Sequence, residues 1–375
     1  MLCEGETLMN GHVSRRTVLV SAGLMALAGR STAAAERGAG SGSSMLRLIA
    51  NENPYGPSPA ARDAATHAVA DSWKYAMRET AELKKLIADH AGVTPKHVMV
   101  CAGSTEALRV SALLFGRDGG QVVAARPTFS FLPDYARALG CEVAEVPLDT
   151  NMRHDLDAMA SALRSDARLV YVCNPNNPTG TRVDGTPLRA FIESVSPRVP
   201  VVVDEAYLDL SGDLSAHTAV PRVLAGDPVI VTRTFSKLHG MAGLRVGYAL
   251  ARPDLIERLE SLRISQMSYP GVLAAAASLQ DSEFQDFSRA QIHKGLRITE
   301  EVLTELGRPW VPSYGNFIYF DTGAPARQFM VAMRKAGILT GLGFAPYTNW
   351  ARVSMGKVGQ MRQFAAALRA HFRPE

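Results

Sequence analysis

The chain has 375 residues, of which 47% are hydrophobic and 20% are charged, and its formal net charge is +4. This length and composition are typical of a globular protein with one large or two medium domains. The charge is small for the length, and no lysine- or arginine-rich run with interleaved aromatics follows residue 45, so nothing favours nucleic-acid binding. Cys3, Cys101, Cys141 and Cys173 are scattered without a Cys-x-x-Cys pair, which argues against a zinc site or a disulfide framework.

The first 44 residues have the pattern of an export signal. Arg15-Arg16 precedes a short apolar run over 18–28, which is followed by small residues at 33–35 and a Gly/Ser linker. Such an arrangement is typical of a secretory signal, and paired arginines favour the twin-arginine route. The run is too short for a stable membrane anchor. We therefore expect an exported, periplasmic protein, whereas a true start at Met45 would leave a cytoplasmic one.

From residue 98 onward, short apolar runs alternate with amphipathic stretches. The runs are continuously apolar, as expected of strands that are buried on both faces of a sheet. The expected strands are 98–101, 121–125, 169–172, 201–203 and 229–232, and the expected helices between them are 105–115, 131–139 and 188–194. This alternation predicts an α/β sheet with helices on both faces, and ligands of such sheets bind at the carboxyl ends of the strands.

Beyond residue 271 the pattern changes to that of a smaller α+β unit. The expected elements are a long helical stretch over about 272–306 with a break near 281–283, strands at 316–320, 337–339 and 351–354, and a closing helix at 361–372. The predicted organisation is a signal and linker over 1–44, an N-terminal arm over 45–70, a large domain over 71–270, and an interdomain helix with a small C-terminal domain over 271–375.

A first polar motif, Gly103-Ser104-Thr105-Glu106, follows the first expected strand and opens a helix. Backbone amides at a helix N-terminus, together with two hydroxyl groups, can bind an anion. A serine or threonine followed by glutamate also caps a helix without any ligand. The pattern therefore leaves an anion cradle and a plain N-cap open.

Four further side chains follow strands in the same way. Asn177 lies in a segment with two prolines, which either fixes the direction of its amide or makes an ordinary tight turn. Asp204 ends a buried strand, where a carboxylate needs a partner such as a protonated ring nitrogen unless it faces water. Tyr207 would lie on the same side if a helical turn follows. Phe129 is placed either to stack on a flat ring or to join the core.

Lys237 carries the most informative pattern in the chain. It follows Thr234 and Ser236, and Arg245 lies eight residues further on. An amine can hold an aldehyde covalently, and neighbouring hydroxyl groups with a guanidinium can hold a phosphate. Pyridoxal 5'-phosphate is the cofactor that needs both, so the pattern predicts a pyridoxal-phosphate site.

With these residues assembled, the chain resembles a fold type I, pyridoxal-phosphate-dependent aminotransferase, and it is most similar to the histidinol-phosphate aminotransferase family. The resemblance runs from about residue 47 to the C-terminus. Its motifs are Asn51-Glu52-Asn53-Pro54-Tyr55-Gly56, Asn176-Asn177-Pro178-Thr179-Gly180, Asp204-Glu205-Ala206-Tyr207, Ser236-Lys237 and Gly243-Leu244-Arg245-Val246-Gly247. The resemblance implies a large domain with a mostly parallel, mixed sheet flanked by helices and a smaller α+β C-terminal domain. It also implies that an amino group moves between an amino donor and a 2-oxo acid by a ping-pong mechanism.

The same resemblance assigns roles to individual residues. Lys237 resembles the lysine that binds the cofactor's aldehyde and shuttles a proton, Asp204 the partner of the ring nitrogen, and Tyr207 a donor to the ring's phenolic oxygen. Tyr75 matches a tyrosine that reaches the phosphate in the partner subunit's site, which implies a homodimer with shared active sites. Arg352 matches the arginine that holds the substrate's anionic group. The remaining cofactor contacts implied are Gly103, Ser104, Thr105, Phe129, Asn177, Thr234, Ser236 and Arg245. The other substrate contacts implied are Tyr55, Asn177 and Asn316.

Two departures from the family pattern concern the substrate. Histidinol-phosphate enzymes commonly carry a second arginine about a dozen residues before the one matched by Arg352, but residues 336–351 contain neither arginine nor lysine. The arm that covers the site in relatives is replaced by the signal and linker. We therefore expect an α-amino acid donor with an apolar or aromatic side chain. Histidinol phosphate with 2-oxoglutarate stays the main alternative, and a pyridoxal-phosphate decarboxylase shares the same scaffold. We do not expect a non-catalytic homologue, because Lys237 is present.

Overall fold

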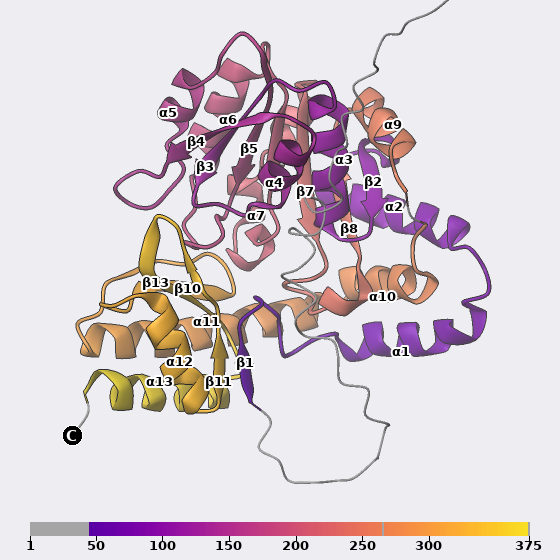
Figure 1. Cartoon of the computed structure of the whole chain (residues 1–375). Helices are drawn as coiled ribbons and strands as arrows, with labels where there is room; N and C mark the ends of the chain where they lie inside the picture. Colours follow the sequence, from indigo (N-terminus) through magenta and orange to yellow (C-terminus); the bar gives the residue numbers. More distant parts are fainter. Residues whose placement is uncertain (1–44, 265, 374–375) are drawn as a thin grey trace, which may run out of the picture. The chain divides into compact units, whose positions relative to one another are not determined.

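The computed structural model describes residues 45–264 and 266–373, which belong to one compact unit, Ser44–Glu375 (Figure 1). The predicted export signal, residues 1–44, lies outside the described residues. Among the described helices, none is both long and apolar enough to cross a membrane.

A seven-stranded sheet forms the centre of the larger part of this unit. In spatial order its strands are β2 (Val98–Cys101), β8 (Gly247–Leu250), β7 (Val229–Thr234), β6 (Val201–Asp204), β5 (Ala167–Cys173), β3 (Gln121–Arg126) and β4 (Glu142–Pro147). Strands β7, β6, β5, β3 and β4 pair in parallel, whereas β8 runs antiparallel to both β7 and β2. The five strands expected from residue 98 onward are confirmed, and the sheet is mostly parallel and mixed.

Alternate residues of these strands enter two different cores, because successive side chains point to opposite faces of a sheet. Val201 and Val203 of β6 belong to one core, whereas Val202 belongs to the other. Helices over residues 59–68, 77–91, 185–195, 220–224 and 269–280 contribute to the first core, and helices over 104–116, 131–138 and 253–261 contribute to the second. Burial on both faces explains why the runs are continuously apolar.

The helices of the unit alternate with these strands as the sequence predicts. The α-helices before the C-terminal part are α1 (Pro59–Ala68), α2 (Met77–Ala91), α3 (Ser104–Gly116), α4 (Phe131–Ala138), α5 (Leu156–Ser161), α6 (Gly185–Val195), α7 (Leu214–His217), α8 (Val220–Leu224) and α9 (Pro253–Ser261). Short 3-10 helices are η2 (Val69–Asp71), η3 (Pro95–His97), η4 (Leu208–Leu210) and η5 (Ala242–Leu244).

Two consecutive helices lead into the C-terminal part. These are α10 (Tyr269–Gln280) and α11 (Ser282–Glu305). The break that separates them is local: the side chain of Asp281 accepts a hydrogen bond from the Phe284 amide, so this residue caps α11. The predicted break near 281–283 is confirmed.

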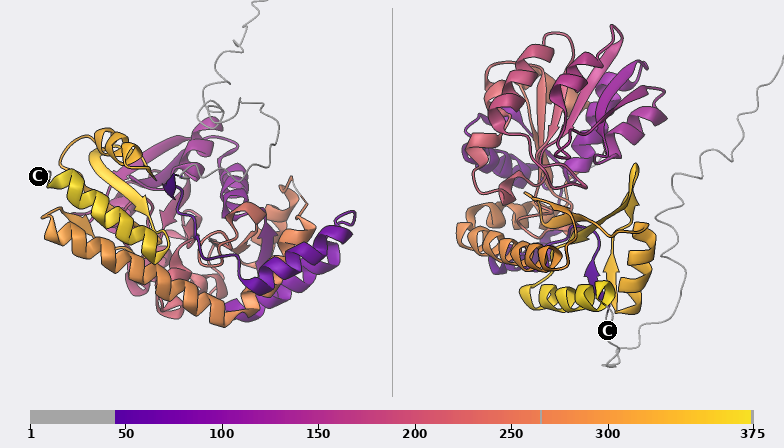
Figure 2. Two further views of the ribbon diagram at one scale, coloured as in Figure 1. Left: turned by 90° about the horizontal axis from the view of Figure 1, so that it is seen from below. Right: turned by 90° about the vertical axis from the view of Figure 1, so that its left-hand side faces the viewer.

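The C-terminal part has its own sheets and core. Strands β12 (Gly343–Phe344), β13 (Tyr347–Ser354), β10 (Phe317–Asp321) and β9 (Trp310–Val311) form an antiparallel sheet, and α12 (Ala326–Lys335) and α13 (Val358–Phe372) complete this part. Helices α11 and α13 lie side by side in both views of Figure 2. Strand β1 (Leu46–Leu48) pairs in parallel with β11 (Ile338–Thr340), so the start of the described chain joins this C-terminal part.

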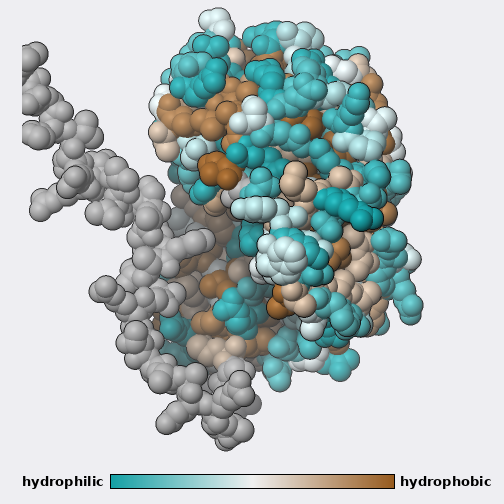
Figure 3. Space-filling view, turned by 90° about the vertical axis from the view of Figure 1, so that its right-hand side faces the viewer, coloured by the Kyte–Doolittle hydropathy of each residue, from teal (hydrophilic) through white to brown (hydrophobic). Residues whose placement is uncertain are grey.

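The connection between α1 and α2 exposes large apolar side chains. It projects at the right-hand edge of Figure 1, which is the side that faces the reader in Figure 3, where hydrophilic and hydrophobic residues are intermixed. Trp73, Tyr75 and Met77 are 80%, 77% and 75% exposed. Such a group of exposed apolar residues is typical of a contact surface.

Candidate functional site

The predicted site residues surround one cavity of 240 Å³, called the lysine pocket below. It lies beyond the carboxyl ends of β6 and β7, where an α/β sheet offers its ligand site. The expected residues on its wall are Ser104, Thr105, Phe129, Asn177, Asp204, Tyr207, Thr234, Ser236, Lys237, Arg245 and Arg352. The structure therefore brings together side chains that are far apart in the sequence, from Ser104 to Arg352.

Four expected residues are not on this wall, although one of them, Gly103, adjoins it. Gly103 is the N-cap of α3, directly before Ser104. Tyr75 lies on the exposed α1–α2 connection. The Tyr55 hydroxyl accepts a hydrogen bond from the Val358 amide, at 2.8 Å. The Asn316 amide donates to the backbone carbonyls of residues 51 and 52, at 2.9 and 3.2 Å.

Lys237 directs its amine into the pocket. The Nζ atom donates to the backbone oxygen of Asn51 at 3.1 Å and lies 5.3 Å from the centre of the Tyr207 ring. Burial, followed by the positive charge of Arg352, lowers the pKa of Lys237 to about 8, whereas the Asp204 carboxylate acts in the opposite direction. A pKa near neutrality gives this amine a substantial neutral, nucleophilic fraction.

Asp204 ends β6 as a buried carboxylate, with only 2% of its surface exposed. Thr232 Oγ1 donates to one of its oxygens at 2.9 Å and the Tyr171 hydroxyl to the other at 3.3 Å. Burial raises its pKa to about 6, which indicates that these two neutral donors do not fully replace water. The alternative of a strand-end acid that faces water is therefore wrong, and the group suits a cationic partner inside the pocket.

The Gly103 segment has the geometry of an anion cradle. Gly103 has φ +77° and carries no side-chain cap, so the simple Ser/Thr N-cap does not describe this helix start. A Cβ atom at this glycine would collide with the guanidinium of Arg245. Arg245 Nη2 donates to Thr105 Oγ1 at 3.1 Å, which places a cation beside the N-terminus of α3.

Two hydroxyl groups complete the same end of the pocket. Thr234 Oγ1 bonds Ser236 Oγ at 2.9 Å and accepts from the Ser236 amide at 3.1 Å. Arg245 itself has a left-handed backbone, with φ +53°, a conformation that is costly for a side chain of this size. Such local strain is typical of residues that a site holds in place for a ligand.

Tyr207 offers a hydroxyl hydrogen to the pocket. Its oxygen accepts from Asn51 Nδ2 at 3.0 Å and from Asn177 Nδ2 at 3.4 Å. Because two amides occupy its acceptor positions, its own O–H is left to donate to a further oxygen. Burial raises its pKa, so this proton stays on the hydroxyl at neutral pH.

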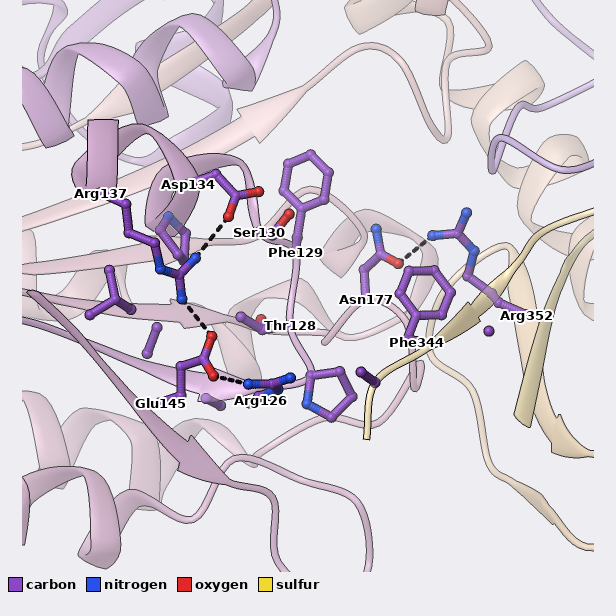
Figure 4. A pocket seen from close by; sticks show the side chains of 17 residues that line it. Arg126, Thr128, Phe129, Ser130, Asp134, Arg137, Glu145, Asn177, Phe344 and Arg352 are labelled. Carbon is purple, nitrogen blue, oxygen red and sulfur yellow. Dashed lines mark hydrogen bonds and ion pairs between the residues drawn. The ribbon is translucent and has the colours of Figure 1, made fainter. Parts of the chain in front are cut away.

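Arg352 approaches the pocket from β13. Its Nη1 donates to Asn177 Oδ1 and its Nη2 donates to the Ile49 carbonyl at 3.1 Å, as Figure 4 shows for the Asn177 pair. The Phe344 ring lies 5.1 Å from the guanidinium carbon. The Nε atom is buried without a partner among the described residues, so the guanidinium retains hydrogen-bonding capacity for a ligand.

Sequence reasoning missed two asparagines of the Asn51–Asn53 stretch. Besides its carbonyl contact to Lys237, Asn51 lines the pocket together with Ala50. Asn53 Nδ2 donates to the backbone carbonyl of Lys237 at 3.0 Å. Residues 50 and 51, which belong to the predicted N-terminal arm over 45–70, thus form part of the pocket wall, whereas the signal and linker that were expected to replace the covering arm of relatives lie outside the described residues. The buried spacing Asn-x-Asn was a usable signal, because buried amides need partners.

The residues present fit pyridoxal 5'-phosphate. A cation with hydroxyl groups and a helix N-terminus suits the phosphate, the amine suits the aldehyde, and a buried carboxylate with a raised pKa suits a protonated ring nitrogen. Together with the mixed sheet, this donor set defines a pyridoxal-phosphate-dependent enzyme of fold type I.

Comparison with known proteins agrees with this class. The family model "Aminotransferase class I and II" matches residues 43–368, and the chain belongs to this family. Pyridoxal 5'-phosphate is accordingly its cofactor, and transamination is its class of reaction.

Relatives and solved structures are similar over almost the whole described chain. Histidinol-phosphate aminotransferase from Moorella thermoacetica is 36% identical over 328 residues, which cover 87% of this chain and 85% of that protein. The corresponding protein from Symbiobacterium thermophilum is 36% identical over 329 residues, with 87% and 90% covered. The structure of histidinol-phosphate aminotransferase from Sinorhizobium meliloti in complex with pyridoxal 5'-phosphate is 30% identical, covers 88% of this chain and 91% of that chain, and has a TM-score of 0.83.

Proposed function

We propose that this aminotransferase works by a ping-pong mechanism, in which an amino donor leaves its amino group on the enzyme and a 2-oxo acid then collects it. The observation that carries the proposal is the lining of the lysine pocket, where the amine of Lys237, the anion cradle at Arg245 and the guanidinium of Arg352 share one wall. One site can then serve both half-reactions in turn.

Each residue around the pocket has a proposed part in this chemistry. When bound, pyridoxal 5'-phosphate supplies an electron sink for the charge that develops at the substrate carbon. Lys237 Nζ removes and returns the proton at that carbon, which its lowered pKa favours. The Asp204 carboxylate keeps the ring nitrogen protonated. Tyr207 and Asn177 donate to the ring oxygen, and Phe129 packs on the ring face. The proposed phosphate contacts are Gly103, Ser104, Thr105, Thr234, Ser236 and Arg245.

The proposed donor is an α-amino acid with an apolar or aromatic side chain. Arg352 binds its carboxylate, and Phe344, which contacts that guanidinium, offers an aromatic surface to the side chain. The lack of lysine and arginine over 336–351 supports this choice. Histidinol phosphate is the second candidate, because the relatives from Moorella thermoacetica and Symbiobacterium thermophilum carry that name.

A spectral half-reaction assay tests the proposed function. Purified holoenzyme is mixed singly with phenylalanine, tyrosine, histidine, glutamate and histidinol phosphate, and conversion of the cofactor to its amine form is followed by absorbance. Addition of a 2-oxo acid should restore the starting spectrum. Release of carbon dioxide without any 2-oxo acid would instead identify a decarboxylase. Lys237→Ala should lose the borohydride-reducible cofactor adduct, and an unchanged adduct would refute the role of this lysine.

A homodimer with shared sites is proposed from the exposed α1–α2 connection. Tyr75 is 77% exposed and lies between two further exposed apolar residues, Trp73 and Met77. In a dimer this connection would bring the Tyr75 hydroxyl to the phosphate cradle of the partner subunit. Sedimentation should give twice the chain mass, and Tyr75→Phe should weaken cofactor binding without dissociating the dimer.

Export through the twin-arginine route is proposed from residues 1–44. The test fuses residues 1–45 to a reporter and locates it in a bacterial host, with Arg15→Lys/Arg16→Lys as the matched control. A reporter that stays in the cytoplasm would refute export.

A further inference from the structure

A second cavity, called the outer cavity below, opens beside the lysine pocket. Both cavities include Phe129, Asn177 and Arg352 on their walls. The outer cavity measures 480 Å³, within the range of roughly 300–1,000 Å³ that is typical of small-molecule sites. In Figure 4 the Asn177–Arg352 pair lies at one end, and a chain of charged side chains lies at the other. A substrate anchored at Arg352 therefore has room to extend towards a second polar end.

Strand register explains how this charged end forms. Strands β3 and β4 pair in parallel, with Ala124 opposite Glu145 and Arg126 opposite Pro147. Side chains two residues apart share a face of a sheet, so Arg126 and Glu145 project from the same face. Helix α4 brings Arg137 to this face, where it bonds the second oxygen of Glu145.

The charges at this end are shared unequally. Glu145 gives one carboxylate oxygen to Arg126 and the other to Arg137, and Arg137 also pairs with Asp134 at 2.8 Å. Among the described residues, the shared Glu145 carboxylate is the only ion-pair partner of Arg126. Arg126 is thus the least neutralised cation of the group, and Glu145 would keep Arg137 as a partner if Arg126 turned to another anion.

Breaking the Arg126–Glu145 ion pair, so that Arg126 can bind a ligand, costs little free energy. The side chains of Arg126 and Glu145 are 47% and 32% exposed, and ion pairs with this much solvent access contribute little to stability. A guanidinium that turns towards a carboxylate in the cavity exchanges one charge-assisted hydrogen bond for another. The pair can therefore open for an anionic substrate group and close again for an uncharged one.

Arg126 offers the outer cavity a second cation, which the C-terminal residues 336–351 do not supply. Residues 336–351, which include Gly343, Phe344 and Ala345 of the cavity wall, contain no lysine or arginine. The cationic side chains on the wall are Arg126, Arg137 and Arg352. The second cation that residues 336–351 do not supply is thus present in the same cavity at the end of β3, as Arg126.

We propose that Arg126 binds the distal carboxylate of a dicarboxylic amino acid or 2-oxo acid while Arg352 binds its α-carboxylate. Glu145 is then the resting counter-ion that Arg126 leaves when this substrate enters. The proposal rests on the proposed transamination at the lysine pocket, and it assigns the residue that lets one site accept a dicarboxylate as well as an apolar substrate.

Binding of inert acids to the holoenzyme tests this assignment without turnover. Isothermal titration compares glutarate, which has two carboxylates, with valerate, which has one. Arg126→Met, which keeps most of the aliphatic stem, should weaken glutarate about tenfold or more and leave valerate within about twofold. Glu145→Gln should strengthen glutarate several-fold, because it removes the competing anion. Arg137→Met, in the same charged group, is the matched control and should change glutarate by less than about threefold.

The outcomes separate a failure of this inference from a failure of the proposed function. Equal weakening of glutarate and valerate by Arg126→Met, or no weakening of either, overturns the assignment. An unchanged cofactor spectrum in the variant shows that its pocket is intact.

In the half-reaction assay, Arg126→Met should lower kcat/KM for glutamate about 30-fold and leave phenylalanine within about twofold. A selective loss on histidinol phosphate would assign the distal anion to a phosphate and overturn the carboxylate. A wild-type enzyme that converts no donor would refute the proposed function, whereas the glutarate titration would still test Arg126.

Discussion

The Nζ atom of Lys237 donates to the backbone oxygen of Asn51 at 3.1 Å, although the two residues are 186 positions apart in the chain. Asn51 has φ +53°, and its amide nitrogen and side chain bond Ser354 and Tyr207. The strained backbone therefore presents a carbonyl to the amine, and its cost is offset by these bonds. The first described segment thus helps to position the proposed catalytic lysine.

Substitution of Asn51 should separate the backbone effect from the side-chain effect. Asn51→Ala and Asn51→Gly both lose the side-chain bonds, but only alanine also carries a Cβ at φ +53°. We expect the alanine variant to be less stable than the glycine variant by about 1 kcal/mol, and both to have a lowered kcat. Urea unfolding of the apoproteins measures the difference. Equal stabilities would show that the left-handed backbone carries no strain.

The pKa of Lys237 predicts how cofactor attachment depends on pH. The neutral amine is the nucleophile, and burial lowers the pKa of Lys237 to about 8. The rate of adduct formation between apoprotein and pyridoxal 5'-phosphate should therefore fall about tenfold per pH unit below pH 8 and level off above it. Stopped-flow absorbance from pH 6 to 10 measures the midpoint. A midpoint near 10.5 would mean that the pocket does not perturb the amine.

The same shift affects the stability of the apoprotein. The folded-state pKa of Lys237, about 8, lies below its ordinary value of 10.5, so the unfolded chain binds more protons between these pH values. The contribution of this group to stability should therefore rise as pH increases from about 8 to about 10.5. Lys237→Met should flatten that rise and should stabilise the apoprotein below pH 8, because it removes a charge from a desolvated position. Denaturant titrations at pH 7 and pH 10 compare the two proteins.

A pair of glycines isolates the importance of the anion cradle. Gly103 and Gly92 both have a positive φ, +77° and +67°, but a Cβ at Gly103 would collide with Arg245 and one at Gly92 would meet nothing within 4 Å. Gly103→Ala should weaken cofactor binding at least about tenfold, because Arg245 must move. Gly92→Ala should cost about 1 kcal/mol of stability and leave cofactor affinity unchanged. Cofactor titration of both apoproteins provides the comparison. Equal affinities would show that the Gly103 segment does not bind the cofactor.

The sequence predicts the five strands of the large sheet that stand out as short apolar runs. It misses the other two strands, β4 and β8. β4 is an edge strand with mostly half-exposed or exposed residues, and β8 contains a glycine and an alanine, which are depleted in strands. Neither gives the apolar run that marks a strand buried on both faces. The short β8 nevertheless makes the sheet mixed, because it runs antiparallel to both neighbours.

The site residues likewise include contacts that the sequence predicts and contacts that it does not. Asp204 and Lys237 are predictable because they follow strands, and the carboxyl ends of parallel strands converge. The contact of Lys237 with Asn51 is not predictable from either segment alone, because it depends on the tertiary packing of residues far apart in sequence. Tyr55 and Asn316 match family motifs, yet their polar atoms bond the backbone of Val358 and of residues 51–52. A motif identifies the residue type, whereas local packing decides where the side chain points.

A buried ion pair beside the site should be important for stability. Glu205 and Arg233 are each 1% exposed and are joined at 2.8 Å, and Glu205 also accepts from the Ala219 amide at 2.7 Å. The pair links β6 to β7 at residues adjacent to Asp204 and Thr234. Arg233→Met should destabilise the protein by about 3–5 kcal/mol, because it leaves a buried carboxylate without its cation.

The double variant Glu205→Gln/Arg233→Met should recover part of this loss, because no buried charge remains. Arg164, which pairs with Glu142 and Asp166 at the surface, is the control, and Arg164→Met should cost no more than about 1 kcal/mol. Urea unfolding of the wild type, Glu205→Gln, Arg233→Met and the double variant gives the coupling energy. A single Arg233→Met variant as stable as the wild type would show that Glu205 finds a different partner or a proton, and cofactor affinity in that variant would then report whether Asp204 and Thr234 have stayed in place.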